Sequence, residues 1–434
     1  MFRFQEDFLQ LIWKYQYFDK NTLETEGGSP IIIHKIGFHN QHEGPDFKEA
    51  EISLGGIRHY GHIEIHLRTS DWKNHNHHSD SAYNAVILHV VWQHDQEVKR
   101  KDGTVIPTLA LEGKVLLDVI RNYQRLQSST KKLLCTDSLP ELSSILKFSM
   151  LEKALVERLQ NKSDQVLDLL KENGNDWEET AYQWLFFSFG FKTNSIPMLK
   201  LAQSLPYKLI KKNAGNIEQI EALIFGQAGL FTPSLDLSQS YEKGLQAEYD
   251  YLLNKYSLKK NLFPSEWKFM KVRPSNFPSF RLAQLSALLS RSPHLFDLVL
   301  HELDSSQSIE RTFDLSVSEY WKKHYHFGKP KPHATQGKLT QNILGLLIIN
   351  YVVPLWYAYG RFADLSVWQE KCFNLLQEIQ AEKNSLIDIY QAVDWPALNA
   401  YDSQGMLGLY HQYCSKRLCL HCKIGQNLLR PNLK

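Results

Sequence analysis

Near Lys114 the hydrophobic pattern of this 434-residue chain changes its period, and that change limits the possible folds more than any other feature. Before it, short β-rich segments are separated by Gly, Asn or Asp turns; they cover Pro30–Phe38, Phe47–Leu54, His59–Leu67, Asn84–Gln93 and Val105–Glu112. After it, apolar residues recur every three or four positions. We therefore expect an α+β protein, with an N-terminal mixed α/β core followed by a mainly α-helical domain.

The same patterns predict where the parts begin and end. Phe4 to Tyr17 has apolar residues at helical spacing, so a helix is expected before the strands. The Asp-Gly pair in Lys101–Thr104 is typical of a hairpin turn between the last two strands. Three parts are predicted: an α/β core at 1–115, a helical domain at 116–404 that the Pro-rich stretch near 262–280 can divide into two subdomains, and a cysteine-rich tail at 405–434.

Composition favours a globular protein of the cytoplasm. Hydrophobic residues make up 43% and charged residues 22%, and a net charge of +2 gives no overall attraction to nucleic acid. Glu6 and Asp7 interrupt the apolar N-terminal stretch, which is unlike a signal peptide. The charge-free segment Gln341–Gly360 has the length of a membrane span, but it contains Asn350 and Pro354. We favour a buried helix over a single span, and we expect no membrane partner.

Polar residues on two neighbouring predicted strands indicate a metal site. Asp46 opens one strand after a Gly-Pro corner, and Glu64 and His66 point to the same side of the next strand. If these strands pair as a hairpin, Asp46 lies beside Glu64. An Asp, a Glu and a nitrogen base in this arrangement can bind Mg²⁺ or Mn²⁺ and activate a water. Solvated residues next to turns are the alternative interpretation.

The following loop is rich in His and Asp. His75 and His77 come near the end of the preceding strand, where they can line a cleft, contact phosphate or bind a transition metal. Asp80 either supports the same site or caps the short segment before the next strand. His89 interrupts an apolar strand and needs a partner if it is buried. For His78 a surface position is the simpler interpretation.

Three of the five cysteines form a C-x4-C-x2-C pattern near the C-terminus: Cys414, Cys419 and Cys422. Short spacings of this kind let a chain wrap around one ion, and C-x2-C is a common half of a structural Zn²⁺ site. The fourth ligand can come from His411, His421 or the distant Cys135. Three incidental reduced thiols are the alternative.

The order of these features resembles the core of the PD-(D/E)XK nuclease superfamily, which has a restriction-endonuclease-like fold. The resemblance rests on a helix, a strand that opens with Pro45-Asp46, and a strand that carries Glu64-x-His66. It implies that Asp46 and Glu64 hold the metal and that Glu6 supplies an additional acidic ligand. His66 stands where these nucleases usually have Lys. A neutral His can act as a base or a ligand, but it is not a permanent cation.

Two further resemblances concern other parts of the chain. The segments "GPDF", "GHIEIHLRTSDWKNHNHHSDSAYNAVILHVV" and "YCSKRLCLHCKIG" are similar to an uncharacterised bacterial family, domain of unknown function 2851. One early cysteine and three near the C-terminus are similar to the arrangement in some nucleases that hold an iron–sulfur cluster. That similarity implies such a cluster as the alternative to Zn²⁺.

The favoured function is a metal-dependent nuclease acting on DNA or RNA. No P-loop, G-x-S-x-G or H-E-x-x-H motif occurs, so a phosphate cradle or a serine nucleophile is not indicated. One alternative is a non-catalytic interaction or nucleic-acid-binding protein on the same scaffold, and another is a metal-dependent hydrolase of a small molecule. The alternatives differ in whether Asp46, Glu64 and His66 converge, and in whether they do so in an open cleft or a closed pocket.

Overall fold

The computed structural model describes residues 5–40, 42–231, 240–259, 262–292 and 294–431. The chain divides into two compact units. The first contains Met1–Glu152, Ala392–Trp395 and Leu409–Lys434, and the second contains Lys153–Gln391 and Pro396–Gly408. The predicted fold class is confirmed, since a mixed sheet lies in the N-terminal part and the region after it is mainly helical.

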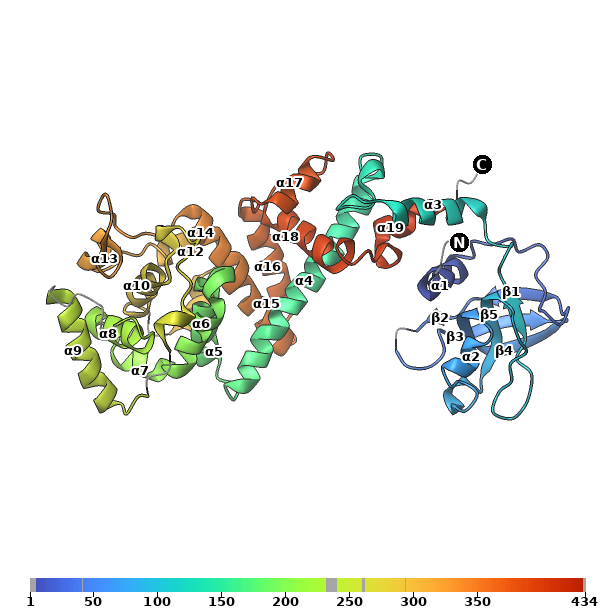
Figure 1. Cartoon of the computed structure of the whole chain (residues 1–434), viewed down its shortest axis with the longest axis horizontal. Coiled ribbons are helices and arrows are strands. Elements are labelled where there is room, and N and C mark those ends of the chain that lie inside the picture. Colours follow the sequence, from blue (N-terminus) through green and yellow to red (C-terminus); the bar gives the residue numbers. More distant parts are fainter. Residues whose placement is uncertain (1–4, 41, 232–239, 260–261, 293, 432–434) are drawn as a thin grey trace. The chain divides into compact units, whose positions relative to one another are not determined.

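Within the described residues, the first unit has one mixed sheet (Figure 1). Its strands are β1 (Ile31–Lys35), β2 (Phe38–His39), β3 (Phe47–Leu54), β4 (Ile57–Arg68), β5 (Val86–Gln93) and β6 (Thr108–Ala110). The order is β1-β3-β4-β5-β6, and β2 also pairs with β3. The β1–β3 and β3–β4 pairs are antiparallel, whereas β4–β5 and β5–β6 are parallel.

The parallel pairing corrects one prediction. A two-residue turn joins antiparallel strands only, so the predicted hairpin around Lys101–Thr104 cannot connect β5 with β6. The Asp-Gly turn does form, but it closes an isolated antiparallel bridge between Lys99 and Val105. Gly103 has φ 83° in this turn, a conformation that glycine adopts without strain.

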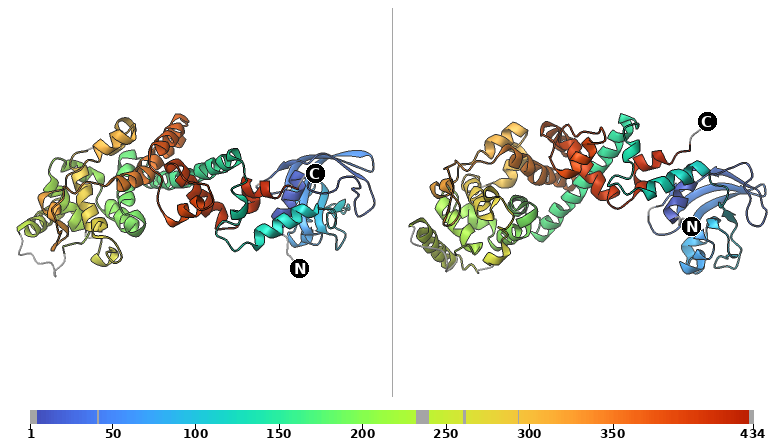
Figure 2. Two further views of the ribbon diagram at one scale, coloured as in Figure 1. Left: turned by 90° about the horizontal axis from the view of Figure 1, so that it is seen from above. Right: turned by 45° about the horizontal axis from the view of Figure 1, so that its top comes forward.

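Helix α1 (Glu6–Tyr15) packs on one face of the sheet, and α3 (Leu117–Ser128) contributes to the same hydrophobic core beside it (Figure 2). The rings of Phe8 and Tyr123, one from each helix, stack with their centroids 4.2 Å apart. The predicted first helix is therefore confirmed, although its expected start at Phe4 lies outside the described residues.

The C-terminal segment contributes to the same hydrophobic core. Leu420 and Leu429, which flank α19 (Lys423–Leu428), are buried in the cluster formed by α1, α3 and the sheet. Asn122 of α3 donates a side-chain hydrogen bond to the carbonyl oxygen of Arg430 at 3.3 Å. The first unit is thus built from both ends of the chain.

The opposite face of the sheet carries the histidine-rich turn, which contains α2 (Asp71–Asn74) and a 3-10 turn, η1 (Ser81–Tyr83). Trp72 and Tyr83 belong to a small core there, together with Val86, Val98 and Ile106. Side chains alternate along β4, and Ile63 and Ile65 point into the core under α1. Glu64 and His66 therefore point toward the turn.

The second unit is helical apart from a short ribbon of β7 (His324–His326) and β8 (Lys329–Pro330) within the described ranges. The helical character that was predicted for this part of the chain is confirmed. Its helices, starting with α4, which begins in the first unit, are α4 (Ser144–Glu172), α5 (Trp177–Phe189), α6 (Phe191–Ser204), α7 (Tyr207–Lys212), α8 (Ile217–Gln227), α9 (Ser240–Lys255), α10 (Pro278–Leu289), α11 (Leu295–Asp297), α12 (Ser306–Thr312), α13 (Glu319–Lys323), α14 (Gln341–Leu347), α15 (Val353–Phe362), α16 (Val367–Glu378), α17 (Ser385–Gln391) and α18 (Ala400–Leu409).

The charge-free segment is a buried helix of this unit. Helix Gln341–Phe362 comprises α14, a π-helical turn and α15, and 78% of its most apolar window is buried. Pro354 has no N–H to donate to the carbonyl four residues earlier. That carbonyl, of Asn350, accepts instead from Trp184 Nε1 at 3.0 Å and Ser188 Oγ at 3.1 Å. The prediction of a buried core helix is confirmed.

Candidate metal centre

The position of Asp46 is set by a corner of the chain that the side chain of Asn40 stabilises. Asn40 Nδ2 donates to carbonyl oxygens within residues 42–45 at 2.9, 3.1 and 3.1 Å, and Asn40 N donates to Asp46 O at 2.7 Å. Gly44 has φ 96°, which favours glycine. The Gly-Pro corner is therefore well defined, and it places Asp46 at the start of β3.

Asp46 and Glu64 are held side by side by backbone groups. Asp46 N–H donates to Glu64 Oε2 at 3.1 Å, and Ile65 N–H donates to Asp46 Oδ2 at 2.9 Å. The second oxygen, Asp46 Oδ1, accepts from Gln10 Nε2 of α1 at 2.9 Å. The predicted antiparallel pairing of the two strands thus brings Asp46 beside Glu64.

Glu6, at the start of α1, is the third carboxyl group of the cluster. Burial, and then repulsion from Asp46 and Glu64, raises the pKa of Glu6 to about 8. Burial also raises the pKa of Asp46 and of Glu64, and repulsion from Glu64 adds to the effect on Asp46. Glu64 is only 5% exposed. Three carboxyl groups placed in this way resist joint ionisation, and a divalent cation would relieve their repulsion.

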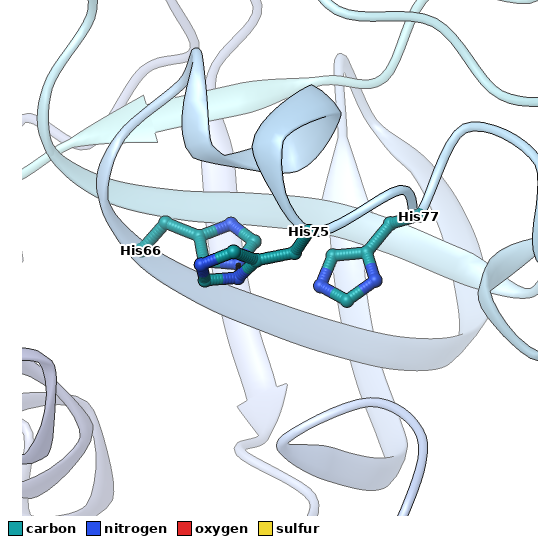
Figure 3. A group of neighbouring side chains, drawn as sticks. All are labelled: His66, His75 and His77. Atoms are coloured by element: carbon teal, nitrogen blue, oxygen red, sulfur yellow. Dashed lines mark hydrogen bonds between the residues drawn. The ribbon is translucent and has the colours of Figure 1, made fainter.

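Imidazole groups gather at the other oxygen of Glu64, and Figure 3 shows three of them. Glu64 Oε1 lies 3.2 Å from His77 Nε2 and 3.5 Å from His66 Nε2. His66 Nε2 lies 3.1 Å from His75 Nδ1, and His66 Nδ1 lies 2.8 Å from His89 Nε2. Burial, and then the neighbouring histidines, lowers the pKa of His66 to about 2. His66 is therefore neutral near pH 7.

The other predicted residues of the turn differ in exposure and role. His75 and His78 are exposed, whereas His77 is half-buried and its ring stacks on Tyr83 with centroids 3.7 Å apart. Asp80 Oδ1 accepts from the Ala82 N–H at 2.9 Å, which is the capping role predicted as one of its two possibilities. Burial lowers the pKa of His77, and the nearby carboxylate of Asp80 opposes this change.

Several residues of the site were missed in the sequence analysis. Gln10 follows Glu6 by one helical turn, so the spacing on α1 carried a signal for it. Neither Asn40 nor Tyr83 belongs to any recognisable pattern. His89 was expected to need a partner; it is fully buried, and that partner is His66.

Cys135 of the first unit lies within electrostatic range of two C-terminal thiols, those of Cys419 and Cys422. Burial, and then the thiols of Cys422 and Cys419, raises the pKa of Cys135 to about 12. Cys414 ends a π-helical turn, η7 (Tyr410–Cys414), that adjoins the segment containing the other two C-terminal cysteines. The fold thus brings Cys135 to the C-terminal pattern, from which nearly 300 residues of sequence separate it.

Side chains around the cysteines make local contacts. His421 Nε2 lies 3.0 Å from Asp7 Oδ2 of α1. Arg417 donates to the carbonyl oxygen of Gln127 at 3.1 Å. These contacts fasten the C-terminal segment to α1 and α3. Because the pKa of Cys135 responds to Cys422 and Cys419, Cys135 is the strongest candidate for a fourth ligand.

The fold and the site define an α+β protein with a candidate metal centre at one end of a mixed sheet. The chain belongs to the family described as "Protein of unknown function (DUF2851)", whose model matches residues 6–385. The resemblance to that family is thereby confirmed. No curated protein and no solved structure shows a significant match to the chain, so the nuclease resemblance rests on residues and topology alone.

Proposed function

We propose that the protein is a metal-dependent nuclease that hydrolyses phosphodiester bonds of DNA or RNA. The convergence of Glu6, Asp46 and Glu64 from three separate elements supports this proposal most directly. Carboxylate oxygens are the ligands that Mg²⁺ and Mn²⁺ prefer. A divalent ion held there would supply an activated water and neutralise charge on the phosphate.

The order of elements also supports the proposal. Glu6 lies on the first helix, Asp46 immediately precedes β3, and Glu64 and His66 lie on β4, which is followed by a parallel neighbour. Both ring nitrogens of His66 lie against other groups, Nδ1 against His89 and Nε2 against His75 and Glu64. We therefore assign His66 the role of a ligand or positioning residue, and not that of a proton acceptor.

A nuclease assay tests the proposal. Purified protein would be incubated with single- and double-stranded DNA and RNA in Mg²⁺, Mn²⁺ or EDTA. We expect metal-dependent cleavage that Asp46→Asn and Glu64→Gln abolish. Glu43→Gln, which changes the same charge on an exposed side chain nearby, should retain it. Folded wild-type protein that cleaves nothing with either metal would refute the proposal, and metal-independent binding of nucleic acid would then favour an interaction protein.

We also propose that Cys135, Cys414, Cys419 and Cys422 hold a structural Zn²⁺ ion or iron–sulfur cluster. A metal would bind the thiolate forms and so offset the burial that raises the pKa of Cys135. Reduced thiols of this kind suit the cytoplasm, which is the location we propose. Metal analysis should show that Cys419→Ser holds one ion or cluster fewer than wild-type protein. Cys372→Ser, which replaces a buried cysteine of α16, should hold as much metal as wild type.

A further inference from the structure

We propose that Glu64, His66, His75 and His77 bind a transition-metal ion such as Zn²⁺ at a second site, which adjoins the three-carboxylate site and shares Glu64 with it. The two oxygens of Glu64 have different neighbours. Oε2 accepts the Asp46 N–H, whereas Oε1 faces His66 and His77. Glu64 can therefore bridge two ions. Only this bridging rests on the proposed nuclease function; the histidine site does not.

Three of the separations between the donor atoms are close to those around a single ion. A tetrahedral Zn²⁺ with Zn–N bonds of about 2.0–2.1 Å holds its ligand atoms about 3.3 Å apart. The corresponding separations are 3.1 Å between His66 Nε2 and His75 Nδ1, 3.2 Å between Glu64 Oε1 and His77 Nε2, and 3.5 Å between Glu64 Oε1 and His66 Nε2. One ligand atom from each of the three histidines lies within 4.8 Å of the others.

The donor set selects for a transition metal. Imidazole nitrogens suit Zn²⁺ and its neighbours in the first transition row, whereas Mg²⁺ prefers an all-oxygen shell. A set of three imidazoles and one carboxylate therefore differs in preference from the oxygen cluster at Glu6 and Asp46. The two halves of the site are chemically suited to two different ions.

Two of the imidazole rings are held in position by neighbours. Metal-binding histidines usually donate their second ring N–H to an acceptor, which fixes the ring orientation. His66 Nδ1 lies 2.8 Å from His89 Nε2. When His66 Nδ1 carries the proton and donates it to His89, the lone pair on His66 Nε2 is directed at His75 and Glu64. The ring of His77 is held by stacking on Tyr83. His75 is exposed and can adjust to an ion (Figure 3).

Co²⁺ binding tests the proposal, because Co²⁺ substitutes for Zn²⁺ and absorbs visible light. Metal-stripped wild-type protein would be titrated with Co²⁺, and an ion at the histidine site should absorb without the charge-transfer band of a thiolate-bound ion at the cysteines. His75→Ala and His77→Ala should weaken this binding at least tenfold. His78→Ala, which alters an exposed histidine of the same turn, should bind like wild type. Circular dichroism would verify the fold of each variant.

Asp46→Asn separates this proposal from the proposed nuclease function. It alters the carboxylate site but no ligand of the histidine site, so Co²⁺ binding should persist while cleavage is lost. The proposal is wrong if wild-type protein binds Co²⁺ only through thiolates, or if folded His77→Ala binds Co²⁺ as tightly as wild type. Persistent Co²⁺ binding without any nuclease activity would count only against the nuclease.

Discussion

Asp46 donates its backbone N–H to Glu64 Oε2 at 3.1 Å, so two carboxyl groups that lie 18 positions apart in the chain are fixed side by side. Because a main-chain group makes this bond, substitution of the Asp46 side chain leaves it in place. The Asp46 carboxylate also accepts the Ile65 N–H, which an Asn oxygen can accept equally well. The pairing of the strands and the chemistry of the carboxylates can therefore be separated by experiment.

Asp46→Asn should weaken Mn²⁺ binding at least tenfold and stabilise the metal-free protein. Removing one of three carboxyl groups that repel one another lowers the repulsion at the other two. We expect the free energy of unfolding to rise by about 0.5–2 kcal/mol. Isothermal titration calorimetry measures the affinity, and thermal unfolding measures the stability. Glu43→Gln is the control for loss of one negative charge. An unchanged Mn²⁺ affinity in the variant would remove Asp46 from the site.

His89→Leu should weaken Co²⁺ binding about 10–100-fold without a matching loss of stability. His89 orients His66 through a 2.8 Å contact, yet its own Nδ1 has no hydrogen-bond partner among the described residues. The substitution would remove that unpaired polar atom while leaving His66 Nδ1 without its partner. Co²⁺ titration and urea unfolding report the two effects separately. Equal affinity in the two proteins would show that His89 does not position the ligand.

Ser188→Ala should cost about 1 kcal/mol of unfolding free energy, and less when Pro354 is replaced by Ala. The Ser188 hydroxyl serves the Asn350 carbonyl because Pro354 offers no N–H, and an alanine at position 354 would restore that donor. A double-mutant cycle in urea measures the coupling between the two positions. Strictly additive effects would mean that the side-chain bond does not compensate for the proline.

The unfolding free energy of the helical unit should fall as pH rises from about 4.5 to about 7, and Glu221→Gln should lose this dependence. Burial raises the pKa of Glu221 from 4.5 to about 7, although Tyr241 and Ser318 donate hydrogen bonds to it at 2.8 and 2.9 Å. In that window the folded state keeps a proton that the unfolded state loses.

Amide hydrogen exchange in α8 at several pH values measures this effect, which is on the order of 3 kcal/mol across the window. The full destabilisation should be present above pH 7, where Glu221 is ionised in both states. A variant with the wild-type pH dependence would assign the effect to another group.

Part of the site could be predicted because it depends on local rules. The Gly-Gly turn at 55–56 sets an antiparallel pairing, and alternation along β4 places Glu64 and His66 on one side. Those two rules bring the two segments together, and a register shift between Phe47 and Ala50, which no sequence pattern revealed, completes the alignment of Asp46 with Glu64. The parallel placement of β5 and β6 could not be predicted. The Asp-Gly sequence determines only the local turn, whereas the choice of neighbouring strand depends on tertiary packing.

The histidine cluster depended on packing that no pattern reveals. His75 and His77 reach His66 because the turn between β4 and β5 folds over Trp72 and Tyr83. The sequence marked these histidines as candidates, but their mutual distances follow from the path of the turn. The partnership of His66 with His89 likewise depends on the alignment of two parallel strands.

The burial of Leu420 and Leu429 in the core of the first unit has a consequence for how the protein folds during its synthesis on the ribosome. They complete a hydrophobic core whose first members are synthesised about 400 residues earlier, at α1. At roughly 5–20 residues per second, the nascent chain waits on the order of tens of seconds for the segment that contains them. The helical unit, most of which emerges in the meantime, can fold first. The acidic cluster, supported by α1, would then mature only after Leu420 and Leu429 have emerged.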